Sequence, residues 1–322
     1  MNFINMKNFS NKLFFELDTN WIKDIQVNLS AVERRTTSLV KRRTVKKEYQ
    51  VAWLLKSITL LDLTTLSGDD TFGKVAKLCQ KALQPISLNI LNSLELKNEK
   101  ILVGAVCVYH NLVSHAKKQL NGKLSVAAVS TGFPAGLSSF QTRKKEITNS
   151  INVGADEIDI VINRAYVLQN DWRRLYDEVR AFKEIAKDKK IKAILGVGDL
   201  ATMRNVAKAS LVCMMAGADF IKTSTGKEKI NANLNNSLVM LRMIREFYDY
   251  FGKKIGFKPA GGISTAKTVL EFLILIYEEL GSSWINPNLL RIGASSLLID
   301  IERQLYHFSE GRYANKEKIA MS

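Results

Sequence analysis

Five ionisable residues interrupt short apolar segments that otherwise have the composition of buried β-strands. They are Asp62, Asp159, Lys192, Lys222 and Lys258. Burying an unpaired charge is costly, so such groups must pair, become neutral or take part in chemistry. A structural ion-pair cluster is the alternative for any one of them. Five together, with Lys222 and Lys258 near the ends of consecutive segments, favour an active site.

Two lysines close together in a partly dry pocket have a definite chemical use. A free lysine has a pKa of about 10.4, so near neutral pH only about one molecule in a thousand carries the nucleophilic amine. A neighbouring ammonium and desolvation both disfavour the charged form and lower this pKa. Lys222 and Lys258, together with a carboxylate, therefore form a reasonable set for imine formation and for proton transfer at a carbonyl.

Glycine-rich and serine-rich segments follow the same strand ends. The segment TSTGK follows Lys222, PAGG follows Lys258, and GASSLL follows the last apolar segment. Glycines let backbone amides approach an anion, and Ser295 and Ser296 precede a predicted helix whose N-terminus favours negative charge. Each glycine alone could mark only a turn, but their coincidence on adjacent strand ends predicts a phosphate site.

Eight short apolar segments must position these groups, and longer stretches with helical periodicity separate them. From the third segment on, their start-to-start spacing of 27 to 36 residues is that of a strand–helix–strand repeat. This alternation predicts an α/β fold, a closed (β/α)8 TIM barrel, and the absence of GxGxxG after the first segment disfavours an open dinucleotide-binding sheet. The apolar segments are 59–64, 102–109, 124–132, 157–163, 191–198, 218–225, 254–262 and 289–296, and the clearest helices are 142–155, 170–188, 235–253 and 266–281.

The chain outside the barrel is predicted to be short. Residues 1–57 are expected to form an N-terminal helical extension packed on the barrel, with one helix around Trp21 and another leading into VAWLLKS. Residues 58–313 are assigned to the barrel and residues 314–322 to a frayed C-terminal tail.

The composition is that of an ordered but basic protein. Of 322 residues, 46% are hydrophobic and 24% charged, which excludes a disordered or fibrous chain. The net charge is +16, and residues 33–50 carry a large share of it, with seven basic and two acidic side chains. Such an excess is common in proteins that bind nucleic acid, an anionic membrane or a phosphorylated metabolite. Because no aromatic residue interleaves with the charges before Tyr49, a solvated helix is favoured over a nucleic-acid patch or a nuclear signal within residues 34–47.

Cysteine usage and hydropathy favour a cytoplasmic protein without a membrane partner. Cys79, Cys107 and Cys213 are widely spaced and odd in number, which fits free thiols in a reducing compartment. No apolar run approaches the roughly 20 residues that span a bilayer. The N-terminus lacks the apolar core of a signal peptide.

Five segments have specific sequences: LDLTTLSGDDT (61–71), GADEIDIVINR (154–164), ADFIKTSTGK (218–227), IGFKPAGG (255–262) and RIGASSLL (291–298). Together they closely resemble the motifs of the deoxyribose-phosphate aldolase family, and the resemblance runs from about residue 16 to 313. It implies a class I, Schiff-base aldolase that acts in deoxyribonucleoside catabolism without a metal or organic cofactor. The reaction implied is the reversible cleavage of 2-deoxy-D-ribose 5-phosphate to D-glyceraldehyde 3-phosphate and acetaldehyde. The basic N-terminal region is similar to that of longer eukaryotic members.

The resemblance also implies residue roles. Lys222 corresponds to the imine-forming lysine, Lys258 to the lysine that lowers its pKa and shares in proton transfer, and Asp159 to the carboxylate of the proton relay. Asp62, Thr64 and Lys192 are candidates to compensate the buried lysine charges. The positions that match the phosphate side are Gly226, Gly261, Gly262, Ser295 and Ser296, with Lys227 as a nearby cation.

Two departures and three rival interpretations remain at this point. Ser264 stands where many family members have arginine, and Val197 and Asp199 lie in VGDL where TGEL is common. A metal-dependent aldolase is disfavoured because His110, His115 and His307 lack a ligand spacing. The other rivals are a different phosphosugar aldolase or isomerase on the same barrel, and a catalytically silent basic binding or scaffold protein. Nucleic acid is not an expected partner; a homo-oligomer is one expectation.

Overall fold

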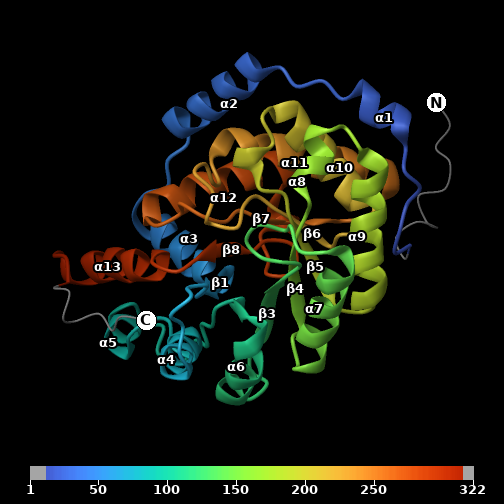
Figure 1. The fold of residues 1–322 in the computed structure, drawn as a ribbon. Helices are drawn as coiled ribbons and strands as arrows, with labels where there is room; N and C mark the ends of the chain where they lie inside the picture. Colours follow the sequence, from blue (N-terminus) through green and yellow to red (C-terminus); the bar gives the residue numbers. More distant parts are fainter. Residues whose placement is uncertain (1–11, 315–322) are drawn as a thin grey trace.

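The computed structural model describes residues 12–314, and within them eight parallel strands form a closed barrel (Figure 1). Neighbouring strands follow the order β7-β6-β5-β4-β3-β2-β1-β8. The sheet closes because Phe257 pairs with Leu290, and Ala260 with Gly293, in parallel bridges. The predicted (β/α)8 barrel is confirmed, and each predicted apolar segment overlaps one strand. The strands are β1 (Leu61–Thr64), β2 (Ala105–Tyr109), β3 (Ser125–Ser130), β4 (Glu157–Val161), β5 (Lys190–Ile194), β6 (Phe220–Lys222), β7 (Gly256–Lys258) and β8 (Ile292–Ala294).

Helices form the outer layer of the barrel, and the predicted ones are present as α7, α9, α11 and α12. The last two end as expected at glycines with positive φ, Gly252 at 69° and Gly281 at 81°. The helices that follow β1 are α4 (Phe72–Leu83), α5 (Leu88–Ser93), α6 (Val113–Leu120), α7 (Phe140–Asn152), α8 (Arg164–Leu168), α9 (Trp172–Ala186), α10 (Met203–Met215), α11 (Leu234–Phe251), α12 (Ala266–Leu280) and α13 (Leu297–Glu310), with short 3-10 turns η2 (His110–Leu112), η3 (Val197–Asp199) and η4 (Ser282–Trp284).

Alternation along the strands separates the apolar core from the candidate site. In β4, Ile158 and Ile160 belong to the large core between the sheet and the helices. Glu157 and Asp159 point the other way, into the barrel, where both contact Lys192. Because both faces of the strand are buried, all five of its residues are inaccessible. The period of two therefore assigns apolar residues to the core and charged residues to the barrel interior.

The N-terminal extension has more regular structure than predicted. Between residues 12 and 60 the chain forms three helices, α1 (Thr19–Asp24), α2 (Leu29–Arg42) and α3 (Lys47–Thr59), whereas the sequence predicted two. The additional helix, α2, contains most of the basic segment. It buries Val32, Thr36 and Leu39 and packs on α11 and α12. One apolar stripe is thus enough to dock a helix whose other faces are charged.

Part of the basic charge of the extension is used inside the molecule. Arg35 pairs with Glu279 at 3.2 Å and with Glu278 at 3.5 Å, and Thr36 donates a hydrogen bond of 2.6 Å to Asn235. Figure 1 shows the extension, in blue, running along the outside of the barrel over α10, α11 and α12. The division of the chain at residues 57/58 and 313/314 stays a prediction, and α3 continues across the first boundary. Residues 1–11 of the predicted extension and 315–322 of the predicted tail lie outside the described residues.

Membrane-spanning helices were not expected. Among residues 12–314, no helix combines the length and the apolar character needed to cross a bilayer.

Gly256 in β7 makes room for an aromatic ring inside the barrel. A Cβ atom at this position would lie 2.4 Å from the ring of Phe220 in β6. We expect Gly256→Ala to lower the free energy of unfolding by about 1–3 kcal/mol, as overpacking of a filled interior does. Urea unfolding is the measurement, with Gly73→Ala in α4 as control, because a Cβ there meets only Thr71 at 3.9 Å. Equal stability of Gly256→Ala and wild type would contradict the close contact.

Candidate active site

The predicted lysines and aspartates meet inside the barrel. On neighbouring strands, Asp159 pairs in register with Lys192, and Lys222 pairs with Lys258. Lys222 lies nearer than Lys192 to the carboxyl ends of the strands, because Phe220, two residues earlier, is the residue in register with Lys192. The three lysines are between 0% and 3% exposed, so their charges must be compensated by neighbouring groups.

Asp159 is the centre of this cluster. Its Oδ2 atom accepts a hydrogen bond of 2.8 Å from Lys222 Nζ and another of 2.8 Å from Lys258 Nζ. Its Oδ1 atom accepts a hydrogen bond of 3.0 Å from Lys192 Nζ. One carboxylate therefore connects the lysines of β5, β6 and β7.

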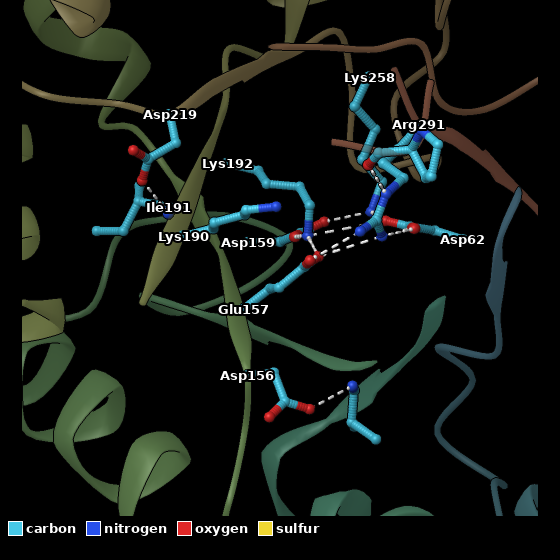
Figure 2. A network of polar contacts seen from close by, with 12 residues as sticks. Asp62, Asp156, Glu157, Asp159, Lys190, Ile191, Lys192, Asp219, Lys258 and Arg291 are labelled. Carbon is cyan, nitrogen blue, oxygen red and sulfur yellow. Dashed lines mark hydrogen bonds and ion pairs between the residues drawn. The ribbon is translucent and has the colours of Figure 1, made fainter. Parts of the chain in front are cut away.

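Asp62 on β1 compensates the cluster from the opposite side of the barrel. Its Oδ2 atom accepts a hydrogen bond from Lys258 Nζ and lies 3.8 Å from Lys192 Nζ. Lys258 is thus held between Asp62 and Asp159. Figure 2 shows these side chains converging from different strands.

Two further charged residues of the cluster were not predicted. Glu157 accepts from Lys192 Nζ at 2.5 Å and from Arg291 Nη2 at 2.8 Å, and Arg291 Nη1 lies 2.6 Å from Asp62 Oδ1 (Figure 2). Both residues stand within the quoted motifs, Glu157 at the inward-facing position two before Asp159. That spacing was a signal for Glu157. Arg291 directly precedes β8, a place where a charged residue is common. Its contacts with Asp62 and Glu157 form only when the barrel closes.

The environment of Lys222 favours its neutral amine. Burial lowers the pKa of the Lys222 ammonium below its ordinary value, and the positive charge of Lys258 acts in the same direction. The Asp159 carboxylate opposes both effects without cancelling them. A lysine with a lowered pKa is the more available nucleophile.

Lys258 has the opposite tendency. Burial alone would lower its pKa, but the charges of Asp159 and Asp62 outweigh burial and raise the pKa of the Lys258 ammonium. Burial likewise opposes ionisation of Asp159, yet its contacting lysines hold the pKa of this carboxyl well below its usual range. The cluster therefore keeps Lys258 as an ammonium beside a lysine that loses its proton more easily.

A cavity of about 450 Å³ opens at the carboxyl ends of the strands, and Lys222 lies in its wall. Thr64 also borders the cavity. Its hydroxyl donates to the backbone oxygen of Asp62 at 2.7 Å and not to a carboxylate of the charged cluster. Asp159 and Lys258 lie behind Lys222, outside this lining. The cavity also has Ser264 in its wall, together with every position predicted to bind phosphate: Gly226, Lys227, Gly261, Gly262, Ser295 and Ser296.

The loops around the cavity present polar groups to it. Gly261 and Gly262 both have φ near +80°, a backbone region that favours glycine. Ser295 and Ser296 directly precede α13. Within residues 12–314, the backbone amides of Gly262, Ser295 and Ser296 donate to no protein acceptor. These amides and the N-terminus of α13 can bind an anion.

The amide of Gly226 differs from the prediction. It donates to Glu228 Oε2 at 3.1 Å, so the anion contact predicted for this amide is made by a carboxylate of the same chain. The cause is local, because the side chain of Glu228 folds back onto its own loop. Gly226, with φ +86°, still lies in the cavity wall.

Between residues 12 and 314, no three or more His, Cys, Asp or Glu side chains are grouped so that they could hold a metal ion. The carboxylates of Asp62, Glu157 and Asp159 instead form ion pairs with Lys192 and Lys258.

Comparison with known proteins places the chain among aldolases. A family model described as DeoC/LacD family aldolase matches residues 56–297. The deoxyribose-phosphate aldolase of Mus musculus is 53% identical over 310 residues, which cover 95% of this chain and 98% of the mouse protein.

Solved structures share the fold at low sequence identity. A Toxoplasma gondii protein has a TM-score of 0.69 at 19% identity, with 86% of this chain and 100% of that chain covered. The deoxyribose phosphate aldolase of Aeropyrum pernix, described as having a unique tetrameric structure, has a TM-score of 0.58 at 19% identity, with 87% and 99% covered. Since the family model spans most of the chain and the mouse relative matches nearly all of it, the protein belongs to the DeoC/LacD family of aldolases.

Proposed function

We propose that the chain reversibly cleaves 2-deoxy-D-ribose 5-phosphate to D-glyceraldehyde 3-phosphate and acetaldehyde through an imine on Lys222. The observation that carries the proposal is the position of Lys222, in the wall of a cavity of about 450 Å³, with a lowered pKa and its Nζ 2.8 Å from Asp159. The test is proton NMR of the purified protein with the phosphosugar. Appearance of both aldehydes supports the proposal, and an unchanged substrate would contradict it.

Imine formation begins the proposed reaction. Neutral Lys222 attacks C1 of the open-chain sugar, and loss of water gives an iminium ion. Removal of the proton from the C3 hydroxyl then breaks the C2–C3 bond, whose electron pair moves into the iminium to form an enamine. Glyceraldehyde 3-phosphate leaves at this step.

Proton transfer completes the reaction. The enamine carbon C2 takes a proton through a water molecule and the Asp159–Lys258 pair, and hydrolysis of the resulting iminium releases acetaldehyde. Lys258 also disfavours protonation of Lys222 by its positive charge. Asp62 and Lys192 balance the buried charges, and Glu157 and Arg291 extend that balance to the other end of the barrel.

The phosphate group is assigned to the glycine and serine end of the cavity. We infer that the amide of Gly262 and the start of α13 at Ser295 and Ser296 make the main anion contacts. Gly261 allows its loop to pack closely against Asn231, because a Cβ at this position would lie 2.6 Å from the Asn231 side chain. Lys227 supplies a cation at the rim.

Activity is expected to survive exhaustive EDTA treatment. The iminium supplies the electron sink that a metal ion would provide in a metal-dependent aldolase. The measurement is the rate of glyceraldehyde 3-phosphate formation before and after chelation. Loss of activity that Zn²⁺ restores would support the metal-dependent alternative.

Ser264→Arg is expected to lower KM for deoxyribose 5-phosphate several-fold. Ser264 borders the cavity but cannot make the charge-assisted contact that arginine makes with phosphate. A partly exposed contact of this kind contributes about 1 kcal/mol. Initial rates with unphosphorylated 2-deoxyribose are the control, and they should not change because that substrate carries no anion.

Ser295→Glu is expected to act in the opposite direction, because it places a negative charge beside the phosphate. It should reduce kcat/KM for the phosphorylated sugar selectively. An equal reduction for 2-deoxyribose would mean that the phosphate binds elsewhere.

We further propose that the enzyme acts in the cytoplasm, in deoxyribonucleoside catabolism, and forms a homo-oligomer. The support for assembly is the tetrameric Aeropyrum pernix relative. Sedimentation velocity tests the proposed assembly: a monomer at micromolar concentration would contradict it.

The packing of α2 on α11 and α12 gives the basic extension a structural role. This packing supports an enzyme over a nucleic-acid-binding protein.

A further inference from the structure

The loop between β6 and α11, residues 223–233, contains an anion-binding turn that is already filled. Glu228 accepts hydrogen bonds from the amide of Thr225 at 3.0 Å and from the amide of Gly226 at 3.1 Å. The Thr225 hydroxyl donates to the same carboxylate at 2.7 Å. Successive amides that point to one side form a concavity for an anion. Here a side chain of the same loop supplies that anion.

This loop connects the imine-forming position to the phosphate end of the cavity. It begins directly after Lys222, and both Gly226 and Lys227 border the cavity. A Cβ at Gly226 would lie 3.9 Å from the α-carbon of Gly261, so the loop passes close to the β7 loop. The conformation of the turn therefore decides where Lys227 and one wall of the substrate cavity lie.

Backbone hydrogen bonds hold the two ends of the loop, and within the turn Asn231 Nδ2 donates to the backbone oxygen of Glu228 at 2.8 Å. Val197 N donates to Thr223 O at 3.0 Å, and Ala232 N donates to Ala260 O at 3.3 Å. Between these ends, the Lys227 amide donates to Thr225 Oγ1 at 3.1 Å, and Thr225 is itself held by Glu228. The Glu228 carboxylate is thus the acceptor for the two successive amides of Thr225 and Gly226 and for the Thr225 hydroxyl.

We propose that Glu228 is a positioning residue that takes the place of an external anion and holds the β6–α11 loop in its active shape before substrate phosphate binds. This inference rests on the proposed function. Glu228 would make the active conformation of the loop independent of the substrate's phosphate. The loops after β7 and β8 would then bind the phosphate. The enzyme should therefore cleave unphosphorylated 2-deoxyribose with a preformed loop.

Removing the carboxylate makes the loop depend on an anion from outside. In Glu228→Ala the amides of Thr225 and Gly226 lose their acceptor, so a smaller fraction of molecules has the active loop, and the apparent rate falls by that fraction. In this variant we expect the phosphate of deoxyribose 5-phosphate, bound beside Gly261, to serve the turn, because a Cβ at Gly226 would lie only 3.9 Å from the α-carbon of Gly261. A small dianion such as inorganic phosphite can serve it when the substrate has no phosphate.

The experiment measures kcat/KM of wild type and Glu228→Ala with deoxyribose 5-phosphate and with 2-deoxyribose, the latter with and without phosphite. For 2-deoxyribose, Glu228→Ala should fall roughly 10- to 100-fold, the scale of one charge-assisted hydrogen bond, and phosphite should restore much of the loss. With the phosphorylated sugar the fall should be less than about 5-fold. In wild type, phosphite should give no comparable activation.

Glu184→Ala is the matched control, because it also removes one carboxylate, in this case the exposed partner of Arg180 on α9. It should leave all three rates unchanged: with deoxyribose 5-phosphate, and with 2-deoxyribose in the absence and in the presence of phosphite. Glu228→Gln keeps an oxygen acceptor without the charge, and its rate with 2-deoxyribose should lie between those of wild type and Glu228→Ala.

Equal losses for both sugars in Glu228→Ala, without rescue by phosphite, would overturn the inference and indicate general damage to the fold. Failure of wild type to cleave either sugar would instead contradict the proposed function. The two failures are therefore distinguishable.

Discussion

Borohydride reduction in the presence of acetaldehyde is expected to leave a stable ethyl group on Lys222. Reduction traps the iminium that a neutral lysine forms with the aldehyde, and among the buried cluster lysines Lys222 has the lowered pKa and lies in the cavity wall. Lys258 is held as an ammonium between Asp62 and Asp159. Peptide mapping by mass spectrometry locates the modified residue.

The same position should be indispensable for turnover. Lys222→Ala is expected to lower kcat by at least ~10³-fold, because the covalent path is removed and not merely slowed. Lys267→Ala, an exposed lysine at the start of α12, is the control and should retain both labelling and activity. An adduct on Lys258, or full activity of Lys222→Ala, would overturn the assignment.

Lys258→Leu and Asp159→Asn are each expected to lower kcat by at least ~100-fold, the scale of a positioned proton-transfer group. Asp159 Oδ2 contacts both Lys222 and Lys258 at 2.8 Å, so either change breaks the proton path. Exchange of the C2 protons of acetaldehyde for deuterium isolates the enamine step and should slow by a similar factor.

The two variants should differ in the pH dependence of imine trapping. Trapping requires the neutral amine, so it falls as the pH decreases through the pKa of Lys222. Lys258 lowers that pKa, so Lys258→Leu should move the transition to higher pH. Asp159 raises it, so Asp159→Asn should move the transition to lower pH. Shifts in the same direction for both variants would contradict the charge arrangement.

Stability must be measured alongside these rates. Lys258→Leu leaves Asp62 and Asp159 with one fewer cation, and an uncompensated buried charge can cost about 3–5 kcal/mol. Urea unfolding identifies the concentration range in which both variants are native. If both are folded and turn over at nearly the wild-type rate, the proton-relay proposal is wrong.

The sequence by itself predicted the barrel, which the structure confirms, and the residues of the proposed imine site, which the structure brings together. Single charges in segments that are otherwise apolar stand out locally, because a strand covered on both faces rarely contains a charge. Lys222, Lys258 and Asp159 were identified in this way, and so were Asp62 and Lys192. The glycine and serine segments after the same strands were equally visible, since their composition is a local property.

Tertiary structure decided which charges meet. Arg291 precedes β8 and Asp62 lies on β1, 229 positions away, so their 2.6 Å contact exists only because the barrel closes. Glu157 was missed although it shares the inward face of β4 with Asp159, because a charge at the start of a strand is common. The docking of α2 likewise depends on distant partners such as Glu279.

The sequence also did not predict which acceptor the amides of the β6–α11 loop bind. The TSTGK segment predicts a turn with amides free to bind an anion, but which anion fills it depends on where Glu228 points. A glutamate in a polar loop has the same local pattern whether it is solvated or folded back. Local patterns report how each segment is buried, whereas the identity of the partners follows from three-dimensional closure, which brings remote side chains within hydrogen-bond distance.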